Sequence, residues 1–232
     1  MVTDYITIKR TAIMIDVYEI KGESETLADT LSSYCLVPVV QLDRVEAARP
    51  LAEALIRGGL SCAEITFRTD AAAASIAAVC AAYPDMFVGA GTILTTDQAD
   101  AAVQAGARFL VSPGFNPAVV EHCLKKGYPI LPGVCTPSEV ERALSYGLTR
   151  LKFFPSEAAG GTAMLKALSA PYRMVRFMPT GGIHPGNVRD YLACPSVFAC
   201  GGSWMVPRNK VNGGCFAEIE QLTAQAAALL KG

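Results

Sequence analysis

The sequence has little charge and no apolar run of membrane-spanning length. Charged residues make up 18% and hydrophobic residues 51% of the 232 residues, and the formal net charge is -1. This composition predicts a globular protein. Nucleic acids and anionic membranes are bound through basic faces, and the chain lacks a basic run interleaved with aromatics, so neither is expected as a partner. The alanine-rich segment AAAASIAAVCAAY is closed by Pro84 and predicts a packed helix.

Cysteine pairs of the CxxC type are absent as well. The eight cysteines are scattered, and several fall in apolar segments, where a thiol behaves as a small hydrophobe. The first residues carry Asp4, Asp16 and Glu19 and lack the apolar core of a secretory signal. We therefore expect reduced, buried thiols and a cytoplasmic protein.

Histidine is scarce, which limits metal chemistry. His122 and His184 are the two histidines of the chain, and neither has the spacing of a metal-ligand pair. Both are interpreted as structural residues, and neither a metal nor another cofactor is expected. A site with carboxylate ligands alone stays open, so a metal-dependent aldolase or a barrel epimerase is the nearest enzymatic alternative.

From Leu36 onward the sequence repeats one pattern, a short apolar strand followed by a helix that ends at glycine. Such alternation predicts βαβ units and a parallel sheet. The expected strands are LVPVVQL, SCAEITF, MFVGAGTI, ARFLVSP, YPILPG, RLKFFP, MVRFMP and SVFACGG.

Helix boundaries are marked by residues that favour them. Helix ends are predicted at Gly58-Gly59, Gly106, Gly127 and Gly147. Helix starts are predicted by N-cap or capping-box residues, followed in three cases by proline: Asp43, Thr95 with Gln98, Asn116-Pro117, Thr136 with Glu139, and His184-Pro185.

Eight such units predict a closed (β/α)8 TIM barrel in a single α/β domain over residues 23–232. An open doubly wound sheet is the main alternative. It is disfavoured because QLDRVEA, and not a glycine-rich dinucleotide fingerprint, follows the first strand. Residues 1–22 are expected to form an N-terminal extension, and the helix from Glu23 to Tyr34 is expected to cover the bottom of the barrel.

Four polar residues are predicted to lie at the carboxyl ends of the strands, where barrel enzymes place their catalytic groups. Strand side chains alternate between the barrel interior and the surrounding helices. In SCAEITFR the parity of Glu64 and Arg68 is opposite to that of the apolar set, so both are expected to point inward. The same argument turns Lys152 inward and places the Thr92 hydroxyl at the mouth. Any one of them is commonly structural, but three ionisable groups inside one barrel favour function.

These residue types fit carbon–carbon bond cleavage. Burial disfavours the charged form of a lysine amine, and a neutral amine can attack a carbonyl to form a Schiff base. A carboxylate such as Glu64 can move the proton, and the planar fork of Arg68 can bind a substrate carboxylate. The set predicts a metal-independent aldolase that acts on a 2-oxo acid, with Lys152 as the nucleophile.

Two glycine pairs predict a phosphate site. The loops after the seventh and eighth strands are the usual phosphate seat of this fold, because glycines let backbone N–H groups approach the anion. These loops carry Gly181, Gly182, Gly201, Gly202 and Ser203, whose hydroxyl adds a donor.

Taken together, the motifs from Val37 to Pro207 resemble those of one family, the class I 2-keto-3-deoxy-6-phosphogluconate (KDPG) and 4-hydroxy-2-oxoglutarate (KHG) aldolases. The resemblance rests on motifs in the family's order, namely EITFRT, VGAGTIL, VSPGFN, LPGVCTPSE, KFFPSEAAGG, RFMPTGGI and GGSWMVP. Phe67-Arg68-Thr69 and Ser203 favour the gluconate substrate over its galactonate epimer.

The resemblance implies an activity and a residue role for each motif. KDPG would be cleaved to pyruvate and D-glyceraldehyde 3-phosphate in the Entner–Doudoroff pathway. 4-Hydroxy-2-oxoglutarate would be cleaved to pyruvate and glyoxylate. The enzyme would be a homotrimer. Lys152 would form the Schiff base and Glu64 would transfer the proton. The remaining implied contacts are Arg68 and Thr92 to the pyruvate carboxylate, Phe154 beside the pyruvyl group, Pro113 and Thr180 in the pocket wall, and Gly181, Gly182 and Ser203 at the phosphate.

A second class of function stays open, a barrel that binds a phosphorylated sugar acid without cleaving it. That alternative predicts ligand binding without a covalent adduct.

Overall fold

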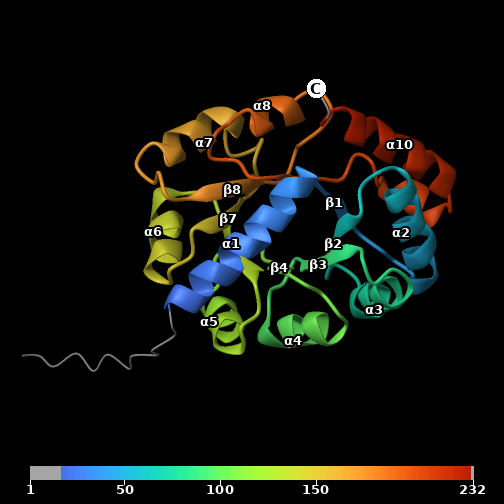
Figure 1. Cartoon of the computed structure of the whole chain (residues 1–232), viewed down its shortest axis with the longest axis horizontal. Helices are drawn as coiled ribbons and strands as arrows, with labels where there is room; N and C mark the ends of the chain where they lie inside the picture. Colours follow the sequence, from blue (N-terminus) through green and yellow to red (C-terminus); the bar gives the residue numbers. More distant parts are fainter. Residues whose placement is uncertain (1–16, 231–232) are drawn as a thin grey trace, which may run out of the picture.

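In the computed structural model, which describes residues 17–230, the chain forms a curled parallel sheet surrounded by helices (Figure 1). The predicted α/β class and the parallel direction of the strands are confirmed. The strands are β1 Leu36–Val40, β2 Cys62–Thr66, β3 Phe87–Gly91, β4 Leu110–Val111, β5 Ile130–Leu131, β6 Gly133–Val134, β7 Arg150–Phe153, β8 Arg176–Pro179 and β9 Cys200–Gly202.

The hydrogen-bonded sheet is divided into two pieces, which differs from the single closed sheet expected. Six strands follow the order β5-β4-β3-β2-β1-β9, and three follow β6-β7-β8. The break between β5 and β6 falls at Pro132, which has no N–H to donate to a neighbouring strand. Between β8 and β9 the contact consists of isolated bridges, Phe177 with Val197 and Thr180 with Gly201.

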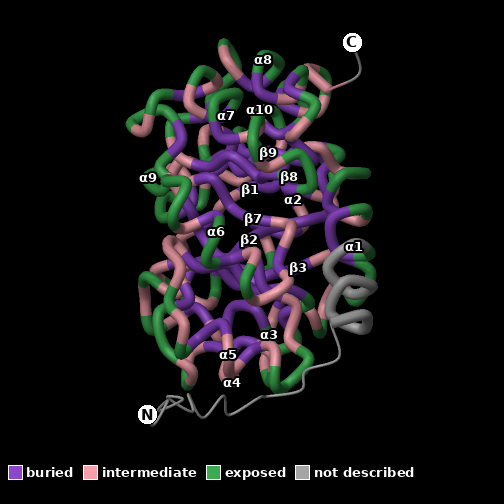
Figure 2. The backbone as a smooth tube through the Cα atoms, turned by 90° about the vertical axis from the view of Figure 1, so that its left-hand side faces the viewer, coloured by how far each residue is buried: buried purple, intermediate pink, exposed green. Residues whose placement is uncertain are grey.

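Helices follow most strands and pack on the outer side of the sheet (Figure 1). Figure 2 shows the strands buried at the centre and the outward sides of the helices exposed. The helices are α1 Val17–Tyr34, η1 Val45–Ala47, α2 Ala48–Arg57, α3 Ala72–Ala82, α4 Thr96–Gln104, α5 Pro117–Lys126, α6 Pro137–Ser145, α7 Gly161–Ser169, α8 Val188–Leu192, α9 Arg208–Asn212 and α10 Phe216–Ala228.

Two hydrophobic clusters separate the two faces of the strands. In β2, Ala63 and Ile65 belong to the large cluster that includes the helices, whereas Cys62 belongs to a smaller cluster with residues from other strands and α1. In β7, Leu151 and Phe153 join the large cluster. The alternation predicted for these strands is thus present, and it leaves the other face of each strand for polar groups.

Most of the predicted helix starts are confirmed. Thr95 and Thr136 each form a capping box, and the Asn116 side chain accepts from the backbone of α5. Two predictions are wrong. Asp43 does not cap η1, because its carboxylate forms an ion pair with Arg208 instead. No helix starts at His184, since α8 begins at Val188.

The helix α1 begins at Val17, earlier than the start expected at Glu23. It lies across the strands in Figure 1, and Leu27, Ala28 and Leu31 pack with strand residues in the smaller hydrophobic cluster. Of the predicted N-terminal extension, residues 1–16 lie outside the described part, and residues 17–22 belong to the start of α1.

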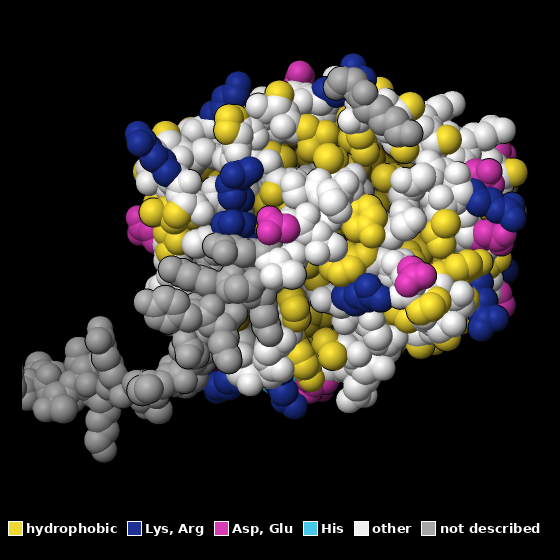
Figure 3. Space-filling model, in the orientation of Figure 1, with side chains coloured by type: hydrophobic (Ala, Val, Ile, Leu, Met, Phe, Trp, Pro, Cys, Tyr) yellow, Lys and Arg dark blue, Asp and Glu magenta, His cyan; other side chains and the backbone are white. Residues whose placement is uncertain are grey.

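The described face around α1 carries positive and negative side chains interspersed among apolar ones (Figure 3). All eight cysteines are free thiols; four are buried as expected, whereas Cys35, Cys80, Cys135 and Cys215 are partly exposed. Within residues 17–230, every helix is too short or too polar to cross a membrane.

Candidate active site

Of the three ionisable residues predicted to share the interior, Glu64 and Lys152 lie next to each other, whereas Arg68 is exposed. The Nζ of Lys152 is 3.4 Å from Oε1 of Glu64. Both side chains are buried, with 6% of the Lys152 side chain and 0% of the Glu64 side chain exposed. An amine and a carboxylate in contact away from water can exchange a proton directly, which removes both charges from the interior.

Small residues on the neighbouring strands make room for this pair. Gly91, at the end of β3, lies beside the carboxylate, and a methyl group at this position would come within 2.0 Å of Glu64 Oε1. Gly133 pairs with Lys152 across β6 and β7, and its backbone packs against the carbonyl of Pro113. Glycine is therefore required at both positions by close contact.

The surroundings of the amine are apolar on one side and polar on the other. The Nζ of Lys152 lies 5.1 Å from the ring centroid of Phe154, two residues further along the chain. Four side-chain oxygens of the described residues are buried without a hydrogen-bond partner, and two of them, Glu64 Oε2 and Thr180 Oγ1, belong to predicted site residues. Buried polar atoms are nearly always paired, so both oxygens are free to bind a polar group of a ligand.

Arg68 and Thr92 are also brought together, as their positions at strand ends predict. Arg68 Nε donates to Thr92 Oγ1 over 3.3 Å. Thr92 has a φ of 59°, which is unusual for a β-branched residue. Backbone strain of this kind costs on the order of 1–3 kcal/mol and concentrates at functional sites.

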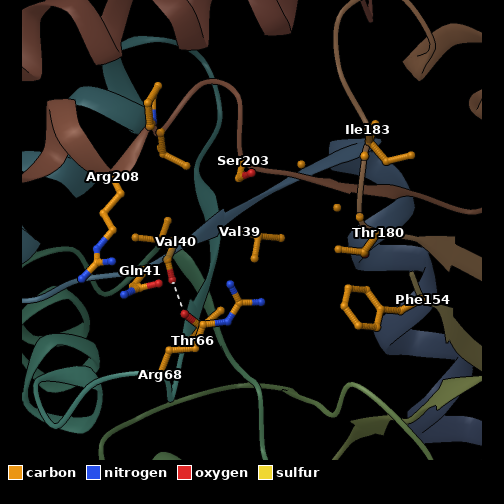
Figure 4. A pocket seen from close by; sticks show the side chains of 16 residues that line it. Val39, Val40, Gln41, Thr66, Arg68, Phe154, Thr180, Ile183, Ser203 and Arg208 are labelled. Atoms are coloured by element: carbon orange, nitrogen blue, oxygen red, sulfur yellow. Dashed lines mark hydrogen bonds between the residues drawn. The ribbon is translucent and has the colours of Figure 1, made fainter. Parts of the chain in front are cut away.

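A cavity of about 300 Å³ opens at the carboxyl ends of the strands (Figure 4). In this view Phe154 and Thr180 form one wall and Arg208 with Gln41 the opposite wall, while the guanidinium of Arg68 points between them. Eight predicted residues line the cavity: Arg68, Phe154, Thr180, Gly181, Gly182, Gly201, Gly202 and Ser203.

Four further predicted residues lie beside the lining. Lys152 and Glu64 are buried behind it, and Thr92 reaches it through Arg68. Pro113 lies outside the described lining, with its carbonyl against Gly133.

The glycine loop after β8 is held by side chains from α8 and its flanks. Gly181 and Gly182 have φ values of 96° and 83°, which favour glycine. Asn187 Nδ2 donates to the Gly182 carbonyl over 3.0 Å. The Tyr191 hydroxyl donates to Glu157, whose stem lies where a side chain at Gly182 would project. Burial, reinforced by this hydrogen bond, raises the pKa of Tyr191, so the phenol remains a donor.

Eight residues of the cavity lining were not predicted from the sequence: Val39, Val40, Gln41, Thr66, Ile183, Val206, Pro207 and Arg208. Arg208 is held by Asp43 through two hydrogen bonds, Nε to Oδ2 at 2.9 Å and Nη2 to Oδ1 at 3.1 Å. Asn212 Nδ2 also donates to Asp43 Oδ2 over 2.6 Å. These hydrogen bonds, the one from Arg208 first, lower the pKa of Asp43 to about 2. The parity of β1 was a signal for Val39 and Gln41, whereas the sequence offers none for the pairing of Asp43 with Arg208.

The fold and the site define a class of protein: an α/β enzyme in which a buried amine and a buried carboxylate meet below a cavity at the carboxyl ends of parallel strands. A family profile described as KDPG and KHG aldolase matches residues 27–222. The chain belongs to this aldolase family, as its motifs predict.

Individual relatives agree with this assignment. The 2-dehydro-3-deoxy-phosphogluconate aldolase of Treponema pallidum (strain Nichols) is 52% identical over 205 residues, which cover 88% of this chain and 98% of the relative. The KHG/KDPG aldolase of Escherichia coli (strain K12) is 42% identical over 191 residues, which cover 82% of this chain and 90% of the relative.

Among solved structures, KDPG aldolase from Legionella pneumophila, with pyruvate captured as a covalent carbinolamine intermediate, superimposes with a TM-score of 0.82 at 38% identity. The match covers 85% of this chain and 97% of that one. The aldolase of Zymomonas mobilis ZM4 with 3-phosphoglycerate gives a TM-score of 0.81 at 39% identity, covering 87% and 95%.

Proposed function

We propose that this chain is a Schiff-base aldolase that cleaves KDPG to pyruvate and D-glyceraldehyde 3-phosphate. The observation that carries the proposal is the buried contact between Lys152 and Glu64, 3.4 Å apart, below a cavity of about 300 Å³. Family membership adds support, because relatives are named for this activity and the Legionella enzyme holds pyruvate as a covalent carbinolamine.

The first half of the reaction makes the substrate electrophilic. Proton transfer from Lys152 leaves a neutral amine, which attacks the 2-oxo carbon of the substrate to give a carbinolamine. Loss of water yields an iminium, which draws electrons from the neighbouring carbon–carbon bond. Glu64 takes part as the general acid and base, and its unpaired Oε2 is the oxygen with room for the reacting proton.

The second half breaks and remakes bonds at the third and fourth carbons. Glu64, directly or through water, accepts the proton of the 4-hydroxyl as the bond between the third and fourth carbons breaks. The aldehyde leaves, and the electron pair stays on the enamine. Reprotonation of the third carbon and hydrolysis of the iminium then release pyruvate and return the free Lys152 amine.

The remaining residues bind the two ends of the substrate. Arg68, oriented by Thr92, binds the carboxylate, and Phe154 packs beside the pyruvyl group. The buried hydroxyl of Thr180 has no hydrogen-bond partner among the described residues. It forms a hydrogen bond with a substrate hydroxyl. Gly181, Gly182, Gly201, Gly202 and Ser203 surround the phosphate, where backbone N–H groups and one hydroxyl are the donors.

Trapping with borohydride tests the Schiff base. The protein is incubated with pyruvate and borohydride, and the modified peptide is mapped by mass spectrometry. The expected product is a reduced pyruvate adduct on Lys152, with Lys166, an exposed lysine of α7, left unmodified as the internal control. An active enzyme with an unmodified Lys152 peptide would exclude this mechanism, and binding without any adduct would favour the non-catalytic alternative.

A second substrate, 4-hydroxy-2-oxoglutarate, is supported by the relatives named for both activities. Both acids carry an anionic group beyond the fourth carbon, a carboxylate bonded directly to it in one and a phosphate ester on the sixth carbon in the other. The galactonate epimer is the alternative substrate, and its aldolase matches less closely, at 27% identity and a TM-score of 0.76. The ratio of kcat/KM for the three acids distinguishes these choices.

The proposal also covers the architecture that supports catalysis. The two sheet pieces form one (β/α)8 barrel closed through the bridges between β8 and β9, and α1 covers its bottom. The barrel forms a single domain over residues 23–232 with residues 1–22 as an extension, and it acts as a cytoplasmic homotrimer without a metal or other cofactor. Activity that resists a chelator excludes the metal-dependent alternative.

A further inference from the structure

The cavity is lined by two guanidinium groups, and its described lining contains no carboxylate. Arg68 comes from the end of β2, and Arg208 is the first residue of α9, on a different wall (Figure 4). Arg68 alone is sufficient for a 2-oxo acid carboxylate. A second guanidinium has a use only if the ligand has a second anionic end.

Arg208 is held in the wall by residues outside the cavity. Its side chain is 61% exposed, and a long exposed side chain normally samples many conformations. The guanidinium is fixed by the two hydrogen bonds that it donates to Asp43, whose carboxylate also accepts from Asn212 and Gln41.

The anchoring leaves donors available for a ligand. An arginine has five N–H groups, and Asp43 accepts from Nε and Nη2. The two N–H groups of Nη1 and the second one of Nη2 remain, and no other partner for them is found among the described residues. A guanidinium with one edge bound to the protein and another free is oriented to bind an anion.

We propose that Arg208, positioned by Asp43, is a specificity-determining residue that binds the anionic end of the aldehyde half of the substrate. This inference rests on the proposed function and extends it to a residue that the glycine loops do not include. A guanidinium binds phosphate and carboxylate alike in a planar fork, so its chemistry is suited to either kind of anionic end.

The ratio of kcat/KM for KDPG to kcat/KM for its unphosphorylated form tests the role of Arg208. Arg208→Gln removes the charge, and Arg208→Lys keeps the charge but loses the fork. Both are compared on KDPG and on its unphosphorylated form. Arg208→Gln should lower kcat/KM for KDPG about 10- to 100-fold, the size of a lost charge-assisted hydrogen bond, and change it for the unphosphorylated acid less than about twofold. The kcat/KM of Arg208→Lys for KDPG should lie between those of Arg208→Gln and the unmodified protein.

Arg44→Gln is the matched control. Arg44 is the neighbour of Asp43, is exposed, and donates to the Asn212 carbonyl over 2.9 Å, but it lies outside the cavity lining. The Arg44→Gln substitution removes the same charge from the same region, and kcat/KM for both acids should stay within about twofold of the unmodified protein. Thermal unfolding of each variant shows whether the fold is retained.

Binding of 6-phosphogluconate separates this inference from the proposed function, because that acid has no keto group and needs no Schiff base. Calorimetry should give a dissociation constant at least about tenfold weaker for Arg208→Gln than for the unmodified protein and for Arg44→Gln. If the unmodified protein cleaves neither acid, the proposed function fails while the calorimetric result still tests Arg208. If cleavage occurs but Arg208→Gln affects both acids equally, or neither, the inference is overturned.

Discussion

The amine of Lys152 and the carboxylate of Glu64 are 3.4 Å apart and almost completely withdrawn from solvent. Burying such a pair is costly, and replacing it with apolar residues is often neutral or stabilising. The pair is therefore poorly explained by folding stability. A contact that allows a proton to pass between the two groups explains why both are present.

Glu64→Gln should uncouple adduct formation from proton transfer. Glutamine keeps the shape of the side chain but cannot act as an acid or base. We expect the fold and the pyruvate adduct on Lys152 to be retained, while exchange of the pyruvate methyl protons falls about 10²- to 10⁴-fold, as measured by NMR in deuterium oxide. Glu53→Gln, which alters a surface pair with Arg57, should exchange normally. Normal exchange in Glu64→Gln would remove this residue from its role.

Gly91→Ala should damage the site without touching a reacting group. The new methyl group would lie 2.0 Å from Glu64 Oε1, so the carboxylate must move away from Lys152. We expect kcat to fall about 10²-fold or more, since a displaced base loses most of its effect. Gly114→Ala is the control, because nothing lies within 4 Å of a methyl group there. Equal activity of the two variants would contradict the arrangement described for Glu64.

Ser203→Ala should separate phosphate recognition from chemistry. Its hydroxyl is an added donor in the loop after β9, so its loss should raise KM for KDPG about three- to tenfold and leave the unphosphorylated acid nearly unchanged. Steady-state kinetics on both acids gives the comparison. Ser145→Ala, which removes a hydroxyl bonded within α6, serves as the control. A similar loss on both acids would place Ser203 away from the phosphate.

Tyr191→Phe should weaken the support of the glycine loop. The buried phenol donates to Glu157, and its removal should lower the free energy of unfolding by about 1–2 kcal/mol in urea. Because Glu157 lies against Gly182, KM for KDPG should also rise while pyruvate trapping stays normal. Tyr172→Phe removes a comparable but exposed hydrogen bond to Glu141 and should lower the free energy of unfolding by less. An unchanged KM would confine Tyr191 to a structural role.

The ion pair of Asp43 predicts a pH dependence. The pKa of Asp43 is lowered to about 2 by its hydrogen bonds to Arg208 and Asn212. A lowered pKa means that its stabilising effect is complete above the ordinary value near 3.8 and is lost as the pH falls toward 2. The difference in melting temperature between the unmodified protein and Asp43→Asn should thus be constant from pH 5 to 8 and shrink below about pH 4.

Asp70→Asn provides the comparison for Asp43, because Asp70 is exposed and has no side-chain partner among the described residues. Its melting temperature should follow that of the unmodified protein throughout. A difference for Asp43→Asn that persists unchanged to pH 2.5 would contradict the lowered pKa.

Strand alternation was sufficient to predict much of the site. Glu64 and Lys152 were expected on the inner face because their neighbours Ile65 and Phe153 are apolar, and the structure places the two side chains in contact. Such inference works where one face of a strand packs against helices and the period of two is fixed. It also led to Arg68 and Thr92, which are hydrogen-bonded to each other.

Other features depend on contacts that no local pattern encodes. Asp43 precedes a helix and resembles an N-cap, yet an arginine 165 positions away takes its carboxylate. Tertiary pairing prevailed over the local preference, and Arg208 was missed for the same reason. The break at Pro132 differs from these cases, because the proline in YPILPG, which cannot donate to a neighbouring strand, was a local signal for it.

That break has a consequence for how the enzyme withstands heat. Glu64 belongs to the six-stranded piece and Lys152 to the three-stranded piece, so the catalytic contact crosses the seam between them. On one side the two pieces are joined by the continuous segment 130–134, whose Pro132 carbonyl accepts from the Lys152 N–H, so loosening on warming would begin on the other side, at the isolated bridges of Phe177 with Val197 and Thr180 with Gly201. Such loosening would shift the amine relative to the carboxylate while most strand pairs remain. Activity would then be lost at a lower temperature than the secondary structure, so the turnover rate would report the change before circular dichroism does.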